Sequence, residues 1–201
     1  MCSASTMHRA LVDSGLKPSQ FVVFPGGGGG VGIQGVQLAK AMGMRPIVID
    51  TGAQKKKLSL EMGAETFIDF REVAGPIEDE VKRAAGGVGA HGVIVTAYQA
   101  YAKATAYLGN RIGGVIVCLG LPPKDTMTVG ADPSLFVFKN LRIIGSMVGT
   151  MNDTAMCLQY AQRGLLKSIC EIRGLSEMPE SVQQLRRGEI AGRVVIDFNK
   201  P

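Results

Sequence analysis

The sequence lacks the features of a secreted or disulfide-stabilised protein. Its four cysteines, Cys2, Cys118, Cys157 and Cys170, are scattered and form no C-x-x-C pair. They therefore support neither a disulfide framework nor a self-contained zinc site. The first residues, MCSASTMHRALVDSG, do not combine a basic start with an apolar segment, as a signal peptide does. We expect a cytoplasmic protein.

Two other classes of protein are also disfavoured. No stretch approaches the ~18 uninterrupted apolar residues that a membrane-spanning helix needs. The net charge of +5 comes from scattered lysines and arginines, and the one basic run, Lys55-Lys56-Lys57, contains no aromatic residue. Nucleic-acid binders instead gather positive charge into a patch or stripe. We expect neither a membrane nor a nucleic acid as a partner.

The composition is that of a globular domain with an unusual amount of glycine. A length of 201 residues suits one large domain. Hydrophobic residues make up 46% and charged residues 19% of the chain, which is a normal balance for a folded protein. There are 27 glycines, and five of them are consecutive, so their placement carries the main information.

Short β-branched runs alternate with helical patterns through the middle of the chain. The predicted strands cover residues 21–24, 46–50, 66–69, 92–96, 115–118 and 141–145. The predicted helices between them cover residues 31–42, 55–62, 76–85, 98–108 and 153–163. Nearly continuous apolar strands indicate burial on both faces. We therefore predict a doubly wound α/β (Rossmann) fold, with a mostly parallel six-stranded sheet of order 3-2-1-4-5-6 and helices on both faces.

Two flanks fall outside this alternation, whose core spans about 18–173. Residues 1–17 predict a helix capped by Ser3 or Ser5 and closed at Gly15. Residues 174–201 predict a helix near 178–187 and then a strand over 192–198. We interpret the whole chain as one dinucleotide-binding domain whose flanks indicate a chain cut from something larger.

A glycine-rich segment follows the first strand and leads into a helix. Residues Gly27 to Gly32, with Gly28, Gly29, Gly30 and Val31 between them, satisfy G-x-G-x-x-G; Gly26, Gly29, Gly30 and Gly32 satisfy a variant one residue longer. Five consecutive glycines would match this pattern by chance, and the alternative is a flexible loop. The preceding buried strand and the following amphipathic helix favour a turn that brings backbone amides to a pyrophosphate.

An acidic residue stands where such a site needs one. Asp50 ends the second predicted strand, 18 residues after Gly32, close to the ~20 expected for the acid that binds the adenosine ribose. A 2′-phosphate there would meet a like charge, at a cost of ~1 to ~4 kcal/mol at 4 Å. Asp50 therefore favours NAD over NADP, although Lys55–Lys57 would offset part of the repulsion.

With these residues in view, the chain resembles the zinc-type alcohol dehydrogenases of the medium-chain dehydrogenase family, especially the yeast and fungal kind. The resemblance runs from Cys2 to Lys200. It is carried by the motifs GGGGGVG, Gln37–Gly43, Ala90–Ile94, Leu119–Pro122, Arg163–Leu165 and Gly188–Arg193.

The resemblance implies a set of cofactor contacts and a mode of association. Gly26 through Val31 would hold the pyrophosphate, and Asp50 and Lys55 would lie at the ribose. The residues implied at the nicotinamide end are Thr6, Leu119, Gly120, Leu121, Ser146 and Val148. Arg193 would reach a cofactor phosphate. Relatives form dimers through the equivalent of residues 135–148, so a homodimer is expected.

The resemblance also implies what this chain does not supply. Cys2 matches one of three protein ligands of the catalytic zinc, but the others belong to a catalytic domain absent from this sequence. One thiolate cannot hold a catalytic zinc, so we expect Cys2 to be a lone remnant and zinc to bind only in a full-length relative.

His8 and His91 have no acid or nucleophile at a recognisable spacing and are expected to be surface or hydrogen-bonded structural residues. The catalytic residues therefore stay unassigned.

Three functions are compatible with this sequence. The first is the NAD(H)-binding part of an alcohol dehydrogenase-like oxidoreductase, transferring hydride between NAD and an alcohol or aldehyde. The second is a naturally truncated protein that binds NAD as a scaffold or partner subunit. The third is a redox-neutral enzyme that uses the old cofactor or substrate cleft. The sequence names no substrate.

Overall fold

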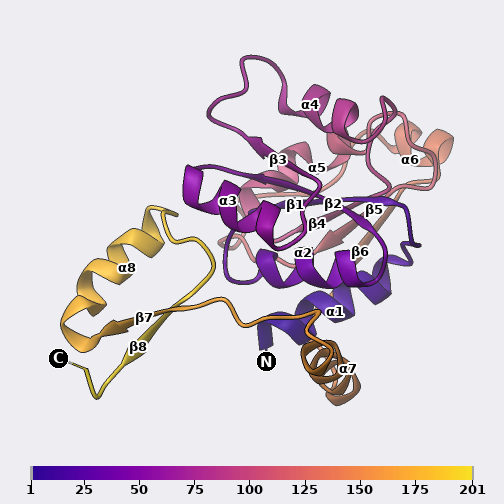
Figure 1. Ribbon diagram of the computed structural model, residues 1–201. Helices are drawn as coiled ribbons and strands as arrows, with labels where there is room; N and C mark the ends of the chain where they lie inside the picture. The colour runs from indigo at the N-terminus through magenta and orange to yellow at the C-terminus, as the bar shows by residue number, and fades with distance from the viewer. Residues whose placement is uncertain (1, 201) are drawn as a thin grey trace.

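The computed structural model, which describes residues 2–200, is built on a six-stranded parallel sheet (Figure 1). The strands are β1 (Phe21–Pro25), β2 (Arg45–Asp50), β3 (Thr66–Asp69), β4 (Gly92–Val95), β5 (Val115–Cys118) and β6 (Arg142–Gly145). Their order is β3-β2-β1-β4-β5-β6, which confirms the predicted doubly wound α/β fold. The strand order therefore reverses between β1 and β4, the point at which such folds bind ligands.

Helices cover both faces of the sheet because successive strand residues point to opposite sides. The helices are α1 (Cys2–Ser14), α2 (Gly32–Ala41), α3 (Ala53–Glu61), α4 (Ile77–Ala84), α5 (Tyr101–Tyr107), α6 (Pro133–Lys139) and α7 (Met151–Gln162). Val22 and Phe24 pack with α1, α2 and α7, whereas Phe21 and Val23 pack with α4 and α5. Across residues 2–200, no helix is both long enough and apolar enough to cross a bilayer.

The N-terminal helix is part of the core. Met7, Ala10 and Leu11 on α1 are at most 1% exposed, and Figure 1 shows α1 beside α2 and α7. Gly15 ends the helix with a positive φ of 68°, as predicted. The expected cap is wrong, however, because α1 already includes Cys2 and both Ser3 and Ser5 lie inside it.

Two short helical elements beside the main sheet were not predicted. Helix α6 has only seven residues and begins after Asp132, whose carboxylate accepts a hydrogen bond from the Ser134 backbone N–H at 2.8 Å. The expected helix over 98–108 begins as a 3₁₀ turn (Tyr98–Ala100) before α5. Both elements are too short to show a full helical period in the sequence.

The C-terminal segment forms a second, smaller unit. Strand β7 (Glu171–Gly174) pairs in parallel with β8 (Val194–Asp197), and a 3₁₀ turn (Leu175–Glu177) and α8 (Met178–Arg186) connect them. Figure 1 shows this unit to one side of the main sheet. Its backbone reaches the main body at Gly192, whose N–H donates to the Gly28 carbonyl at 2.8 Å. The unit is therefore joined to the main sheet at the glycine-rich turn.

Candidate cofactor-binding site

The glycine-rich segment forms a tight turn between β1 and α2. Gly26 adopts a φ of 77°, and its carbonyl accepts a hydrogen bond from the Gly29 N–H at 3.2 Å. A Cβ on Gly32 would lie 2.5 Å from both the Gly26 oxygen and the Gly27 Cα. Only glycine fits that position without moving the backbone. The segment therefore forms a tight turn whose geometry requires glycine.

The start of α2 is available to an anion. Val31 occupies the N-cap position without a side-chain cap hydrogen bond, and α2 has no acidic residue in its first turn. The first N–H groups of a helix have no partner inside the helix, and the helix dipole favours negative charge there. Such an end is an ordinary site for phosphate.

Asp50 lies at the carboxyl end of β2, as predicted, but it already has protein partners. Its carboxylate accepts hydrogen bonds from Gly28 N–H at 3.0 Å, Thr51 N–H at 2.9 Å and the Lys55 ammonium at 2.7 Å. Asp50 and Lys55 are 5% and 8% exposed. A carboxylate has about four acceptor positions, so room for a further donor remains on Oδ2. The pair fixes the glycine turn to the end of β2.

Arg193 lies against the opposite side of the turn. A Cβ on Gly30 would be 2.9 Å from the Gly192 oxygen and 3.4 Å from an Arg193 guanidinium nitrogen. Gly29 and Gly192 form a parallel β-bridge, so the backbone that carries Arg193 is held beside the glycines. The structure thus brings Arg193 to the predicted phosphate end.

The residues expected at the nicotinamide end line one cavity of about 600 Å³. Those from the sequence analysis are Thr6, Leu119, Gly120, Leu121, Ser146 and Val148. The cavity lies at the carboxyl ends of β5 and β6, and most of its lining is apolar. Sequence reasoning missed its other wall, formed in part by Tyr101 and Met127 to Val129. The Tyr101 hydroxyl donates to the Gly120 carbonyl at 2.8 Å, and burial raises its pKa to about 12.

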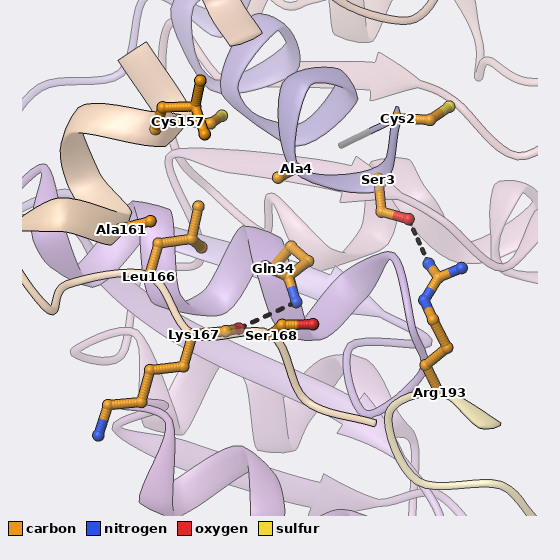
Figure 2. A pocket seen from close by; sticks show the side chains of 11 residues that line it. Cys2, Ser3, Ala4, Gln34, Cys157, Ala161, Leu166, Lys167, Ser168 and Arg193 are labelled. Atoms are coloured by element: carbon orange, nitrogen blue, oxygen red, sulfur yellow. Dashed lines mark hydrogen bonds between the residues drawn. The ribbon is translucent and has the colours of Figure 1, made fainter. Parts of the chain in front are cut away.

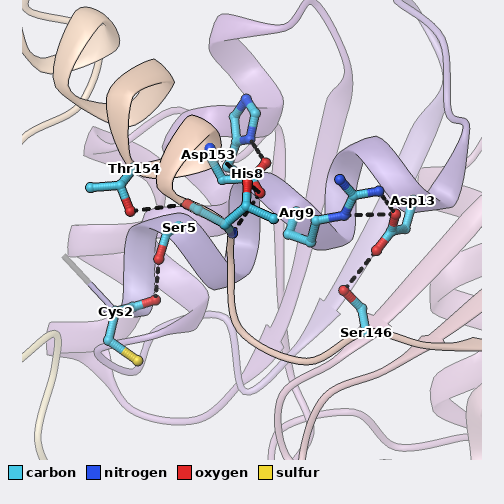
Figure 3. Close-up of polar contacts among 9 residues, drawn as sticks. Cys2, Ser5, His8, Arg9, Asp13, Ser146, Asp153 and Thr154 are labelled. Carbon is cyan, nitrogen blue, oxygen red and sulfur yellow. Dashed lines mark hydrogen bonds and ion pairs between the residues drawn. The ribbon is translucent and has the colours of Figure 1, made fainter.

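Two polar contacts hold α1, one against α7 and one against Ser146 (Figure 3). His8 Nδ1 lies 2.7 Å from Asp153 Oδ1, and both side chains are at most 7% exposed. Because the carboxylate only accepts, Nδ1 carries the proton. The Ser146 hydroxyl donates to Asp13 at 3.0 Å. These contacts hold Thr6, on α1, at the cavity.

The two histidines have structural partners. His8 was expected at the surface or in a structural hydrogen bond, and the second expectation is confirmed. Its acid, 145 residues away in sequence, had no local signal. His91 Nδ1 accepts a hydrogen bond from the Phe21 N–H at 3.1 Å, and burial lowers its pKa.

Asp153 makes the stability of the α1–α7 contact depend on pH in the acid range. Burial by itself raises its pKa, but hydrogen bonds from the Thr150 side chain and backbone and from His8 lower it to about 2. A carboxyl whose folded pKa is depressed stabilises the fold above its unfolded value of 3.8 and loses that contribution as the pH falls toward about 2.

We expect Asp153→Asn to lose less stability than the unmutated chain over this acid range. Urea denaturation followed by circular dichroism between pH 5 and pH 2 would measure this, with Asp125→Asn, an exposed loop residue, as the control. Parallel pH profiles for the unmutated chain and Asp153→Asn would contradict the assignment.

Cys2 lies at a second cavity and does not assemble a metal site. It is exposed, and together with Ser3, Cys157 and Arg193 it lines a space of about 330 Å³ (Figure 2). Within residues 2–200, no group of three or more histidine, cysteine, aspartate or glutamate side chains is placed to hold a metal. A catalytic zinc takes three protein ligands, so the donors of residues 2–200 do not fit one.

Comparison with known proteins agrees with this geometry. The family model of zinc-binding dehydrogenases matches residues 30–163. An alcohol dehydrogenase of Schizosaccharomyces pombe is 39% identical over the whole chain, and alcohol dehydrogenase 1 of Neurospora crassa is 34% identical; the chain covers 56% of each. It thus spans little more than half the length of these relatives.

Solved structures share the fold. The alcohol dehydrogenase of Aeropyrum pernix superposes with a TM-score of 0.83 at 24% identity, covering 96% of this chain and 55% of that one. Acetophenone reductase of Geotrichum candidum in complex with NAD gives 0.76 at 22% identity, covering 99% and 55%. Together with the family-model match and the sequence identities, these similarities show that the chain belongs to the zinc-binding dehydrogenase family.

Proposed function

We propose that this chain binds NAD(H) and forms the cofactor-binding part of an alcohol dehydrogenase-like oxidoreductase. One observation carries the proposal: the glycine turn, Asp50 and the apolar cavity all lie at the carboxyl edge of one parallel sheet. Because β1 and β4 flank the switch point, a ligand can extend from Asp50 across the turn toward β5 and β6. A dinucleotide has the matching order of groups, with ribose, pyrophosphate and nicotinamide in sequence.

Each part of the site has a role toward that ligand. The amides of the glycine turn and the guanidinium of Arg193 bind the pyrophosphate, and Asp50 accepts from the ribose hydroxyls. Leu119, Leu121 and Val148 exclude water around the nicotinamide. The bound cofactor supplies the hydride chemistry, while the protein binds and orients it.

The same geometry is also compatible with a second function. Residues 2–200 present no group of three donors for a catalytic zinc, the metal that would polarise an alcohol. NAD binding without redox turnover, as a scaffold or for a redox-neutral reaction, is therefore the alternative. Oxidation of an alcohol by NAD in the presence of the isolated chain would exclude the alternative, whereas NADH binding without turnover would be compatible with both functions.

The proposal predicts a preference for NADH over NADPH. Asp50 is buried at the end of β2, where a 2′-phosphate would meet its carboxylate. Lys55 already neutralises part of that charge, so we expect a difference of at least about tenfold, the equivalent of ~1.4 kcal/mol of repulsion. Isothermal titration calorimetry with both cofactors would measure it. Equal affinities would remove Asp50 as the selecting residue, and no binding of either cofactor would overturn the proposed function.

We also propose that two copies associate through residues 135–148. Strand β6 is an edge strand that pairs only with β5. Beside it, Val137, Phe138 and Met147 are 77%, 81% and 88% exposed. An exposed apolar edge favours pairing with another chain, and two-fold dimers are the commonest closed assembly.

Phe138→Glu is expected to convert such a dimer into a monomer of 21.2 kDa, measured by light scattering at micromolar concentration. Phe198→Glu is the matched control, because Phe198 is 75% exposed but lies after β8. If only the control dissociated the dimer, the interface would lie on the C-terminal unit instead. A monomeric unmutated chain would refute the dimer.

A further inference from the structure

We propose that Ser3 is a positioning residue that holds the Arg193 guanidinium over the glycine turn. The inference rests on the proposed binding of a dinucleotide and goes beyond it, since it gives a role to a residue that the family motifs do not include. Ser3 is the second residue of α1, and Arg193 lies 190 positions further along the chain. Figure 2 shows the guanidinium directed at the Ser3 side chain.

The contact is a side-chain hydrogen bond at the edge of the turn. An Arg193 guanidinium N–H donates to the Ser3 hydroxyl oxygen, and the same nitrogen lies 3.5 Å from the Gly30 carbonyl oxygen. The Arg193 backbone is held independently, because the neighbouring Gly192 N–H donates to the Gly28 carbonyl. Ser3 therefore acts on the direction of the side chain and not on the path of the main chain.

The guanidinium has no carboxylate partner among residues 2–200, where eleven ion pairs are formed by other side chains. Arg193 is exposed, so without a partner its long side chain would sample many rotamers. Ordering it would then oppose ligand binding. A neutral hydroxyl orders the guanidinium and leaves its positive charge for a phosphate.

Ser3 can do this because α1 is anchored in the core. The helix is anchored by the buried contact between His8 and Asp153 and by the core residues Met7 and Leu11. The same helix carries Thr6 to the apolar cavity. Ser3 thus links the C-terminal unit to a helix that already contributes to the other end of the site.

The test is calorimetric titration with ADP-ribose, which has the pyrophosphate but no nicotinamide. We expect Ser3→Ala to weaken ADP-ribose binding about fivefold, which is within the usual net contribution of one hydrogen bond. Ser3→Thr should restore the affinity because it restores the hydroxyl. Arg193→Ala should weaken binding further, and Ser3→Ala should then add nothing, since the two residues act as one unit. Ser168→Ala is the matched control: Ser168 lines the cavity of about 330 Å³ together with Ser3 and Arg193 but forms no hydrogen bond with Arg193 in the described chain.

The outcomes separate this inference from the proposed function. If the unmutated chain does not bind ADP-ribose, the dinucleotide site itself fails. If it binds and Ser3→Ala leaves the affinity unchanged, the positioning role is overturned while the site stands. A loss in Ser3→Ala that Ser3→Thr does not restore, or that persists in the Arg193→Ala background, would also overturn it, because a general effect on α1 would behave that way.

Discussion

Gly32→Ala is expected to lower the free energy of unfolding by about 3 kcal/mol, the upper part of the usual range for overpacking, and to abolish measurable NADH binding. The added Cβ would lie 2.5 Å from the Gly26 oxygen and the Gly27 Cα. Both are backbone atoms, so no side-chain rotation relieves the clash and the turn must open. The chain contains no tryptophan, so urea denaturation is best followed by circular dichroism and binding by calorimetry.

Gly75→Ala is the control for this prediction. A Cβ on Gly75 has no neighbour within 4 Å, and its φ lies outside the left-handed region. Alanine there should leave stability and NADH affinity unchanged or raise stability slightly through the unfolded state. Normal NADH binding by Gly32→Ala would show that the turn can open without cost, and the steric argument would then fail.

Asp50→Ala is expected to cost about 3–5 kcal/mol of stability, because it leaves the Lys55 ammonium buried without its partner. Both side chains are at most 10% exposed and their charged atoms lie 2.7 Å apart. The substitution also removes the acceptor of the Gly28 N–H, so the glycine turn loses an anchor. We expect NADH affinity to fall at least about tenfold, with the difference between NADH and NADPH narrowed.

The double variant Asp50→Leu with Lys55→Met separates the two effects. Replacing a buried ion pair by apolar residues of similar size is often close to neutral for stability. We therefore expect the double variant to fold nearly as stably as the unmutated chain but to bind NADH as poorly as Asp50→Ala. A double variant as unstable as Asp50→Ala would show that the stability is lost because the Gly28 N–H has no acceptor, and not because the Lys55 ammonium is unpaired. Full NADH affinity in either variant would exclude Asp50 from the cofactor site.

The main sheet was predictable because its signals are local. The apolar runs that predicted strands over 66–69 and 115–118 form β3 and β5 at those residues. Buried strands between two helical layers have nearly continuous apolar sequences, so the pattern identifies them without knowledge of the neighbours. Strand β7 was not predicted from the sequence because it has no such apolar pattern. Glu171 and Ile172 are exposed, and the strand exists because β8 pairs with it.

The site was predictable in its parts but not in its contacts. The positions of Gly32 and Asp50 followed from the spacing between a strand, a turn and a helix. Their partners did not, because no local pattern indicated that the Lys55 ammonium pairs with the Asp50 carboxylate. His8 shows the same limit, since its partner Asp153 is far away in sequence and belongs to another helix.

By itself, the sequence determined which residues form the strands of the main sheet, where the glycine turn lies and which acid ends β2. Each of these depends on neighbours within about twenty residues. Only the tertiary structure decided that Arg193 meets Ser3 at the turn and that His8 and Asp153 hold α1 against α7. These contacts join residues up to 190 positions apart. They depend on how whole helices pack on the sheet, and a hydrophobic pattern specifies which face of a helix is buried but not which distant side chain it meets.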